Sequence, residues 1–156
     1  MNLEEYEHLN SLLKGEIAAI ETYKQAIKSI NDQRTVKILE KCRDSHLTRA
    51  DKLRQLIHEL GHQPTEGGGM WASFAKLLTR ASAAIGERAA ITALEEGEDY
   101  GLSEYEWRLV CLHGNVHHIV KEELFPLQKE THRTIASLAS NYFHGLWPPV
   151  PETTEV

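Results

Sequence analysis

The apolar residues of the first thirty positions recur at intervals of three and four residues. This spacing places them along one side of an α-helix, as in a helix that packs against a core. No proline interrupts the segment, and Asn31-Asp32 supplies a stop followed by the N-cap of a second helix. The pattern predicts a helix over residues 3–30, whose apolar side consists of Leu9, Leu12, Leu13, Ala19, Ile20, Tyr23, Ile27 and Ile30.

The second predicted helix ends inside a short stretch of glycine and proline. Its apolar stripe stops at Leu60, and Gly61 and Pro64 follow, which is a usual arrangement at a helix C-terminus. Residues 62–69 are rich in glycine and are expected to form a loop. Residues 70–81 are predicted to form a short amphipathic helix within the connection to the next long helix.

Two further helices are predicted in the second half of the chain. One covers residues 87–112, and a tight turn at residues 113–115 leads into the last helix, which runs to residue 142. Pro126 lies inside this last helix and is expected to kink it or break its backbone bonding. The predicted domain covers residues 1–144, and a proline-rich C-terminal tail covers residues 145–156.

The lengths of the connections predict the topology. Short turns join the first helix to the second and the third to the fourth, so each pair forms an antiparallel hairpin. A long crossover with a short helix joins the hairpins, which is the ferritin-like arrangement rather than the simple up-and-down one. No segment shows the alternation of a strand, so the fold class is all-α, a ferritin-like four-helix bundle.

Composition excludes several classes of function. The net charge is −6 and the two signs are interleaved, so no basic cluster is available for nucleic acid or an anionic membrane. Cys42 and Cys111 are too few for a disulfide framework and lack metal-ligand spacing. No apolar run approaches the ~20 residues of a bilayer span, and the first residues, Met1 to Glu5, show neither the basic nor the apolar region expected of a leader. A reducing, bacterial cytoplasm is the expected location.

The two hairpins carry similar short patterns. Gly15-Glu16 is followed by Tyr23, and Gly97-Glu98 is followed by Tyr105 at the same offset. The second helix of each hairpin then carries a hydroxyl residue followed by histidine, as Ser45-His46 and Thr131-His132. The order and spacing predict two pseudo-equivalent halves.

The helical spacing places two glutamates and two histidines toward the core. Glu16 and Glu98 fall inside apolar stripes, His46 shares a face with Leu39 and Leu53, and His132 lies near the face of Ile135. A carboxylate inside a bundle is costly unless a cation, a hydrogen bond or a metal receives it. The four side chains are therefore expected to converge.

These motifs resemble the ferritin-like superfamily, in particular a bacterial four-helix family of undefined activity. The resemblance covers nearly the whole chain and rests on Gly15-Glu16…Tyr23, Leu60-Gly61…Pro64, the glycine-rich crossover and Gly97-Glu98-Asp99…Tyr105. It implies iron, or zinc or manganese, held by one glutamate from each of two helices and by a Glu-x-x-His string from each of the others. The implied ligands are Glu16, His46, Glu98 and His132, with Tyr23 and Tyr105 as hydrogen-bond partners around them.

The chain departs from the metal-binding pattern at two positions. Arg43 stands three residues before His46 and Lys129 three residues before His132, where the pattern has glutamate. A dinuclear site would then lack its bridging carboxylates, whereas two nitrogen and two oxygen donors would suit one metal ion. Flanking carboxylates that could complete a site are Glu40, Glu122, Glu123 and Glu130.

The alternative is a protein without a metal. Glu16–Arg43 and Glu98–Lys129 would then be core ion pairs in a bundle that has lost its site. The sequence thus leaves two functions open: a metal-binding ferritin-like protein of undefined activity, or a non-enzymatic helical interaction or structural module, expected as a homodimer. Whether the protein is an enzyme stays open with them.

Two histidine patterns are weaker alternatives. His58-Glu59-Leu60-Gly61-His62 has the zinc-protease form HExxH, but Gly61 ends the helix inside the motif and should turn His62 away from His58. His113, His117 and His118 resemble the histidines of hemerythrin-like proteins, and they are expected at the surface or in the turn.

Overall fold

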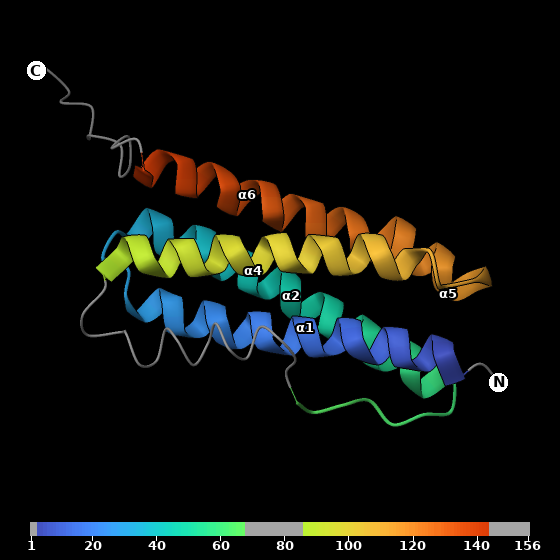
Figure 1. Cartoon of the computed structure of the whole chain (residues 1–156). Coiled ribbons are helices and arrows are strands. Elements are labelled where there is room, and N and C mark those ends of the chain that lie inside the picture. The colour runs from blue at the N-terminus through green and yellow to red at the C-terminus, as the bar shows by residue number, and fades with distance from the viewer. Residues whose placement is uncertain (1–2, 68–85, 144–156) are drawn as a thin grey trace, which may run out of the picture.

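The computed structural model describes residues 3–67 and 86–143, and all secondary structure in these two ranges is helical (Figure 1). Four long helices are accompanied by one short helix and one π-helical turn. In chain order they are α1 (Leu3–Lys28), α2 (Gln33–Glu59), α4 (Gly86–Leu109), α5 (Gly114–Ile119), the π-helical turn η1 (Val120–Leu124) and α6 (Phe125–Phe143).

The four long helices lie side by side as two hairpins (Figure 1). A short turn joins α1 to α2, and α5 and η1 lead from α4 into α6. α1 packs against both α2 and α4, and α4 packs against α6, while the contact between α2 and α6 is sparse. The all-helical four-helix architecture predicted from the sequence is therefore confirmed.

α2 ends and α4 begins at opposite ends of the bundle. Just beyond α2, the backbone N–H of Thr65 donates to Asn10 Oδ1 at 2.8 Å, near the start of α1. The first turn of α4 lies at the opposite end, where the backbone N–H of Asn31 donates to Glu87 Oε1 at 2.6 Å. The short helix predicted over residues 70–81 and the tail over residues 145–156 lie outside the described residues.

The ends of α2 follow from local chemistry. Asp32 is the N-cap and accepts hydrogen bonds from the backbone N–H and the hydroxyl of Thr35. At the other end Gly61 has a φ of 80°, and the N–H groups of Gly61 and His62 bond back to His58 and Ile57. This is a Schellman motif, in which glycine supplies the left-handed conformation. Both predicted signals are confirmed.

The irregular start of the last helix lies directly before its proline. Pro126 has no N–H to donate, so the regular i to i−4 bonding cannot continue through it. The preceding turn, η1, is widened: the N–H of Phe125 bonds to the carbonyl oxygen of Val120, five residues earlier. The predicted break in backbone bonding at Pro126 is thus present as a π-helical turn.

A polar layer divides the apolar core in two. One cluster of buried residues includes Tyr23, Leu39, Ile91 and Ile135, toward the end where α1 finishes, and the second includes Leu9, Leu53, Tyr105 and Leu124. Between the clusters lie buried polar and charged side chains from all four long helices, namely Glu16, His46, Arg49, Glu98, Gln128 and Thr131.

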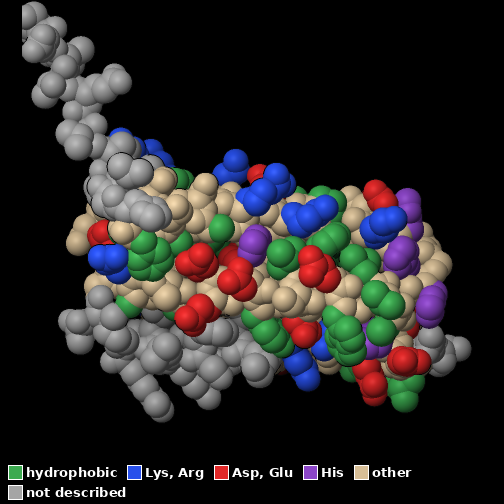
Figure 2. All heavy atoms as spheres, turned by 45° about the horizontal axis from the view of Figure 1, so that its top comes forward, with side chains coloured by type: hydrophobic (Ala, Val, Ile, Leu, Met, Phe, Trp, Pro, Cys, Tyr) green, Lys and Arg blue, Asp and Glu red, His purple; other side chains and the backbone are tan. Residues whose placement is uncertain are grey.

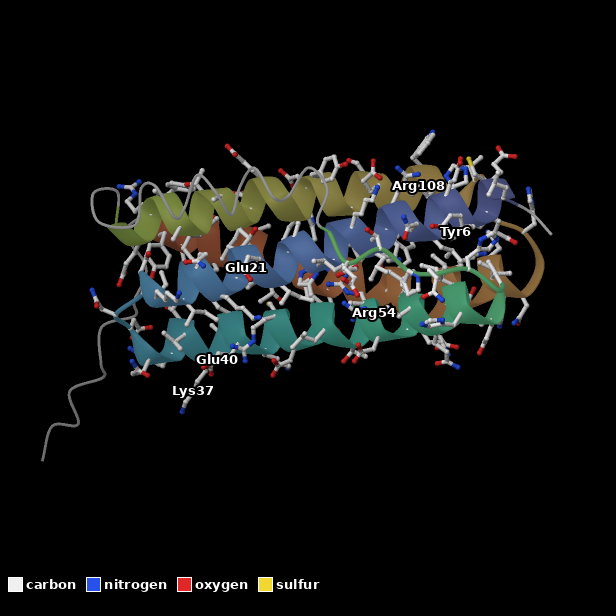
Figure 3. All side chains as sticks on the ribbon, turned by 90° about the horizontal axis from the view of Figure 1, so that it is seen from below. Tyr6, Glu21, Lys37, Glu40, Arg54 and Arg108 are labelled. Carbon is white, nitrogen blue, oxygen red and sulfur yellow. The ribbon has the colours of Figure 1, made fainter. Side chains whose placement is uncertain are left out.

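Charged residues of both signs are spread over the face of the bundle that Figure 2 shows. Lys37 and Glu40 lie together on the outer side of α2 (Figure 3). No helix among the described residues is both long and apolar enough to cross a membrane.

Candidate functional site

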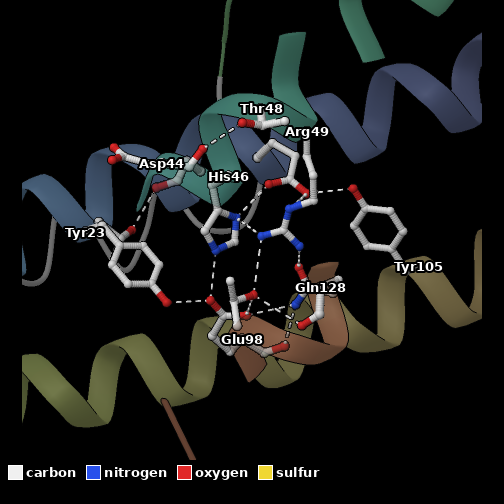
Figure 4. A network of polar contacts seen from close by, with 12 residues as sticks. Tyr23, Asp44, His46, Thr48, Arg49, Glu98, Tyr105 and Gln128 are labelled. Atoms are coloured by element: carbon white, nitrogen blue, oxygen red, sulfur yellow. Dashed lines mark hydrogen bonds and ion pairs between the residues drawn. The ribbon is translucent and has the colours of Figure 1, made fainter. Parts of the chain in front are cut away.

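The candidate site is the buried polar layer together with Tyr23 and Tyr105, which bond to its glutamates (Figure 4). We call these eight residues the core network. They are Glu16 and Tyr23 from α1, His46 and Arg49 from α2, Glu98 and Tyr105 from α4, and Gln128 and Thr131 from α6, and all are buried.

His46 lies between the two carboxylates. Its Nδ1 is 2.6 Å from Glu16 Oε2, and its Nε2 is 2.8 Å from Glu98 Oε1. Carboxylates accept but cannot donate, so both ring nitrogens carry a proton if both of these contacts are hydrogen bonds, and Nδ1 then cannot accept from Arg49 Nη2, which lies 2.8 Å away. The geometry therefore favours the doubly protonated imidazolium form of His46.

The electrostatic surroundings of His46 favour the same charged form. Burial and the adjacent Arg49 guanidinium lower the pKa of His46, but Glu98, Glu16 and the hydrogen bond to Glu16 outweigh them. The net effect raises the pKa of His46 above its ordinary value of 6.5.

Arg49 is the second cation of the core network and is completely buried. Its Nη1 donates to Gln128 Oε1 at 2.6 Å and its Nη2 to Thr131 Oγ1 at 3.3 Å, while its Nε lies 3.5 Å from Glu16 Oε1. Arg49 Nη2 is also 2.8 Å from His46 Nδ1. Two cations this close repel each other, so the flanking carboxylates are needed to hold them together.

The two tyrosines brace the carboxylates crosswise. Tyr23 of α1 donates to Glu98 Oε1 of α4 at 2.5 Å, and Tyr105 of α4 donates to Glu16 Oε1 of α1 at 2.6 Å. Each tyrosine thus bonds to the glutamate of the other half. Burial is the main cause that raises the pKa of both phenols well above 10.0, so they stay protonated as donors.

Helix α6 supplies the remaining donors to Glu98. Gln128 Nε2 donates to Glu98 Oε2 at 2.9 Å, and Thr131 Oγ1 donates to the same oxygen at 3.0 Å. Burial raises the pKa of Glu98 and of Glu16, but His46, Arg49 and the hydrogen bonds outweigh it and lower both below 4.5. The core network therefore pairs two carboxylates with two cations and is formally neutral.

The structure brings together three of the four predicted metal ligands. Glu16, His46 and Glu98 meet in the core network, but His132 does not reach it. His132 Nε2 lies 2.7 Å from Asp99 Oδ1, and its side chain is 24% exposed. The predicted hydrogen-bonding tyrosines, Tyr23 and Tyr105, do contact the core glutamates.

The predicted pairing of the core glutamates with Arg43 and Lys129 is wrong. Arg43 is partly exposed and bonds to Asp44, with Nη2 and Oδ1 3.1 Å apart. Lys129 is exposed, with Nζ 4.7 Å from the ring centre of Phe125. Arg43 directly follows buried Cys42 and Lys129 directly follows buried Gln128, and successive helical residues are rotated by about 100°, so both cations point away from the core. The cations that face the carboxylates are His46 and Arg49.

Sequence reasoning missed Arg49, Gln128 and Thr131. The signal that could have found them is a repeat with a constant separation. Glu16 and Glu98, Tyr23 and Tyr105, His46 and Gln128, and Arg49 and Thr131 each stand 82 positions apart. Pairing His46 with His132 breaks this separation by four positions, about one helical turn, and so selects the wrong residue of α6.

The donor set does not suit a metal ion. Within residues 3–67 and 86–143, no group of three or more His, Cys, Asp or Glu side chains is placed to hold one. The flanking carboxylates Glu122, Glu123 and Glu130 are exposed, and Glu40 is only half-buried. The guanidinium of Arg49 has donors only and cannot be a ligand.

The remaining histidine patterns lie away from the core network. α2 ends before His62, which stacks on Tyr6 with ring centres 4.2 Å apart, while His58 is exposed. The expectation that His62 turns away from His58 is confirmed. Histidine side chains gather at the α5 end of the bundle (Figure 2), where His113 and His118 are exposed and His117 is half-buried.

The space beside the charged groups of the core network is small, and a larger pocket of about 480 Å³ touches the network only at Thr131. The pocket that touches Glu16, His46, Tyr105 and Gln128 has a volume of about 10 Å³, roughly that of one water molecule. Burial raises the pKa of the nearby Cys42 thiol to about 12, so this side chain is an inert thiol at neutral pH.

Fold and site together define a four-helix protein whose core is crossed by a charge-balanced polar layer. The chain belongs to the family described as Domain of unknown function (DUF2383), whose model matches residues 4–109. No curated protein and no solved structure matches it. The matched segment includes the core-network residues of α1, α2 and α4 and ends before those of α6.

We predict that Tyr23→Phe and Tyr105→Phe each lower the free energy of unfolding by about 2 kcal/mol, because each removes a hydrogen bond to a buried carboxylate. Urea unfolding measures the effect. Tyr6→Phe is the matched control, since the Tyr6 hydroxyl makes only an exposed 3.3 Å bond to the carbonyl oxygen of Gln63, and it should change stability by less than about 0.5 kcal/mol. Equal effects at all three positions would contradict the crosswise bracing.

Proposed function

We propose that the protein is a ferritin-like, non-enzymatic helical module whose core holds an internal ion-pair network in place of a metal centre. The observation that carries the proposal is the position of Arg49. Its guanidinium is completely buried beside Glu16 and bonds to Gln128 and Thr131. A divalent cation in the same space would be repelled by this charge.

The ferritin-like part of the proposal is supported by connectivity and by the ligand-bearing helices. Two hairpins, with α2 ending and α4 beginning at opposite ends of the bundle and with an inward glutamate on the first helix of each hairpin, match the arrangement of ferritin-like carboxylate proteins. Glu16 and Glu98 are those glutamates. The difference lies in the side chains around these glutamates, which are cations and neutral hydrogen-bond donors rather than further carboxylates.

The non-enzymatic part is supported by the closure of the core network. Every charged group in it has a partner of opposite charge within the network, and the pocket that reaches Glu16 and His46 has room for about one water molecule. A substrate would have to displace a buried ion pair to reach any of these groups, at a cost of several kcal/mol.

The function then lies in contacts of the outer surface, and we propose a homodimer in the cytoplasm. The apolar side chains of Leu3, Trp107 and Val110 are 61%, 55% and 79% exposed. The start of α1 and the end of α4 lie together, because His8 contacts Trp107 and Arg108. Exposed apolar side chains gathered at one end of a bundle are typical of a protein interface.

Metal loading tests the proposal directly. The purified protein is incubated anaerobically with ferrous iron and desalted, and metals per chain are measured by plasma mass spectrometry. We expect no iron above the level retained by Glu16→Gln, because Arg49 and His46 already neutralise the carboxylates. One or two irons per chain in the wild type, lost in Glu16→Gln, would overturn the proposal in favour of the metal-binding function predicted from the sequence.

Sedimentation velocity tests the interface. We expect the wild type to sediment as a dimer and Trp107→Ala with Val110→Ser to shift it toward monomer, because the variant removes the most exposed apolar area. Phe143→Ala is the matched control, since Phe143 is 45% exposed but lies at the other end of the bundle. A monomeric wild type, or an equal shift in the control, would contradict the proposed interface.

A further inference from the structure

We infer that the imidazolium of His46 and the guanidinium of Arg49 stand in the place of a dinuclear metal centre, and that four exchanges at positions given by the internal repeat restore a site for two divalent cations. The inference rests on the proposed function, in which the wild-type core is held by ion pairs. It adds which positions correspond to metal ligands and which side chains replace the metal.

The internal repeat fixes these positions. Residues 46 and 49 of α2 and residues 128 and 131 of α6 are related by the same separation of 82 that relates Glu16 to Glu98. The side chains at positions 46, 49, 128 and 131 all face the core network. The two positions on each helix are three residues apart. Residues three apart lie on one face of a helix, so each pair reaches the same buried layer.

The same positions match the ligand pattern of dinuclear carboxylate bundles. That pattern has one inward glutamate on each of two helices and an inward Glu-x-x-His on each of the other two. Glu16 and Glu98 are the single glutamates of α1 and α4. α2 and α6 carry His46-x-x-Arg49 and Gln128-x-x-Thr131 instead, so neither first position is a glutamate and neither second position is a histidine.

Charge balance supports this correspondence. In the wild type, two carboxylates face one imidazolium and one guanidinium, which leaves the layer neutral. Four carboxylates facing two divalent cations would also be neutral. An uncompensated buried charge is costly, so two metal ions can be replaced by His46 and Arg49 only if two of the four carboxylates are replaced as well. Loss of a metal would be balanced by the two cationic side chains present in this chain.

The parts of the layer that lie around the metal position are retained. Tyr23 and Tyr105 still donate to the two single glutamates and would orient them in either form. Hydrogen-bond partners that hold ligands in place contribute strongly to metal affinity. The scaffold therefore lacks only the exchanged side chains.

The test is a variant with His46→Glu, Arg49→His, Gln128→Glu and Thr131→His, refolded in the presence of cobalt(II). We expect two cobalt ions per chain after desalting, a visible absorption spectrum of protein-bound cobalt, and a thermal midpoint that falls when a chelator removes the metal. The wild type treated in the same way sets the background.

The matched control is Arg43→Glu with Lys129→Glu. It completes a Glu-x-x-His string before His46 and another before His132, so its sequence carries the motif, but Arg43 and Lys129 do not face the core network. We expect cobalt at the wild-type background. Two cobalt ions per chain in this control would overturn the inference.

A variant with only two exchanges tests the inference if the variant with four exchanges does not fold. Arg49→His with Gln128→Glu removes one cation and adds one carboxylate, so we expect it to bind one cobalt ion per chain. Either variant, helical by circular dichroism but without cobalt above background, would overturn the inference. Cobalt bound stoichiometrically by the wild type would instead overturn the proposed function.

Discussion

Two buried carboxylates paired with two buried cations constrain the rest of this structure. Transfer of one such ion out of water costs several kcal/mol, and removal of one partner from a buried pair costs about 3–5 kcal/mol. Glu16, His46, Arg49 and Glu98 come from three different helices, and α6 adds the neutral donors. The layer is stable only when all four helices hold these groups in register.

The position of the layer gives this constraint its structural effect. An apolar cluster lies on each side of the polar layer. Apolar contacts are not directional, so they restrict the rotation and sliding of packed helices less than the hydrogen bonds of the polar layer do. Tyr23 belongs to one cluster and Tyr105 to the other, and each donates to the glutamate of the opposite half. The core network thereby couples the two apolar clusters and favours one arrangement of the bundle.

The sequence predicted the parts of this structure that depend on periodicity and caps. The four long helices, the ends of α2 and the break before α6 follow from apolar spacing, Asp32, Gly61 and Pro126. Glu16 and Glu98 were found because a charged residue inside an apolar stripe needs a partner. Arg49 was missed because arginine is usually exposed, and spacing alone does not tell which cation on a helix turns inward. His132 was chosen by residue type where the repeat separation indicates Gln128 and Thr131.

The protonation state of His46 tests the central claim most directly. Nitrogen-15 NMR of the histidine side chains, with His46 assigned by its loss in His46→Gln, shows whether one or both ring nitrogens carry a proton. Because a carboxylate oxygen lies within hydrogen-bond distance of each ring nitrogen, we expect both nitrogens to be protonated at pH 7. A neutral imidazole with one bare nitrogen at pH 7 would contradict the charge-balanced core network, since Arg49 would then be its only cation.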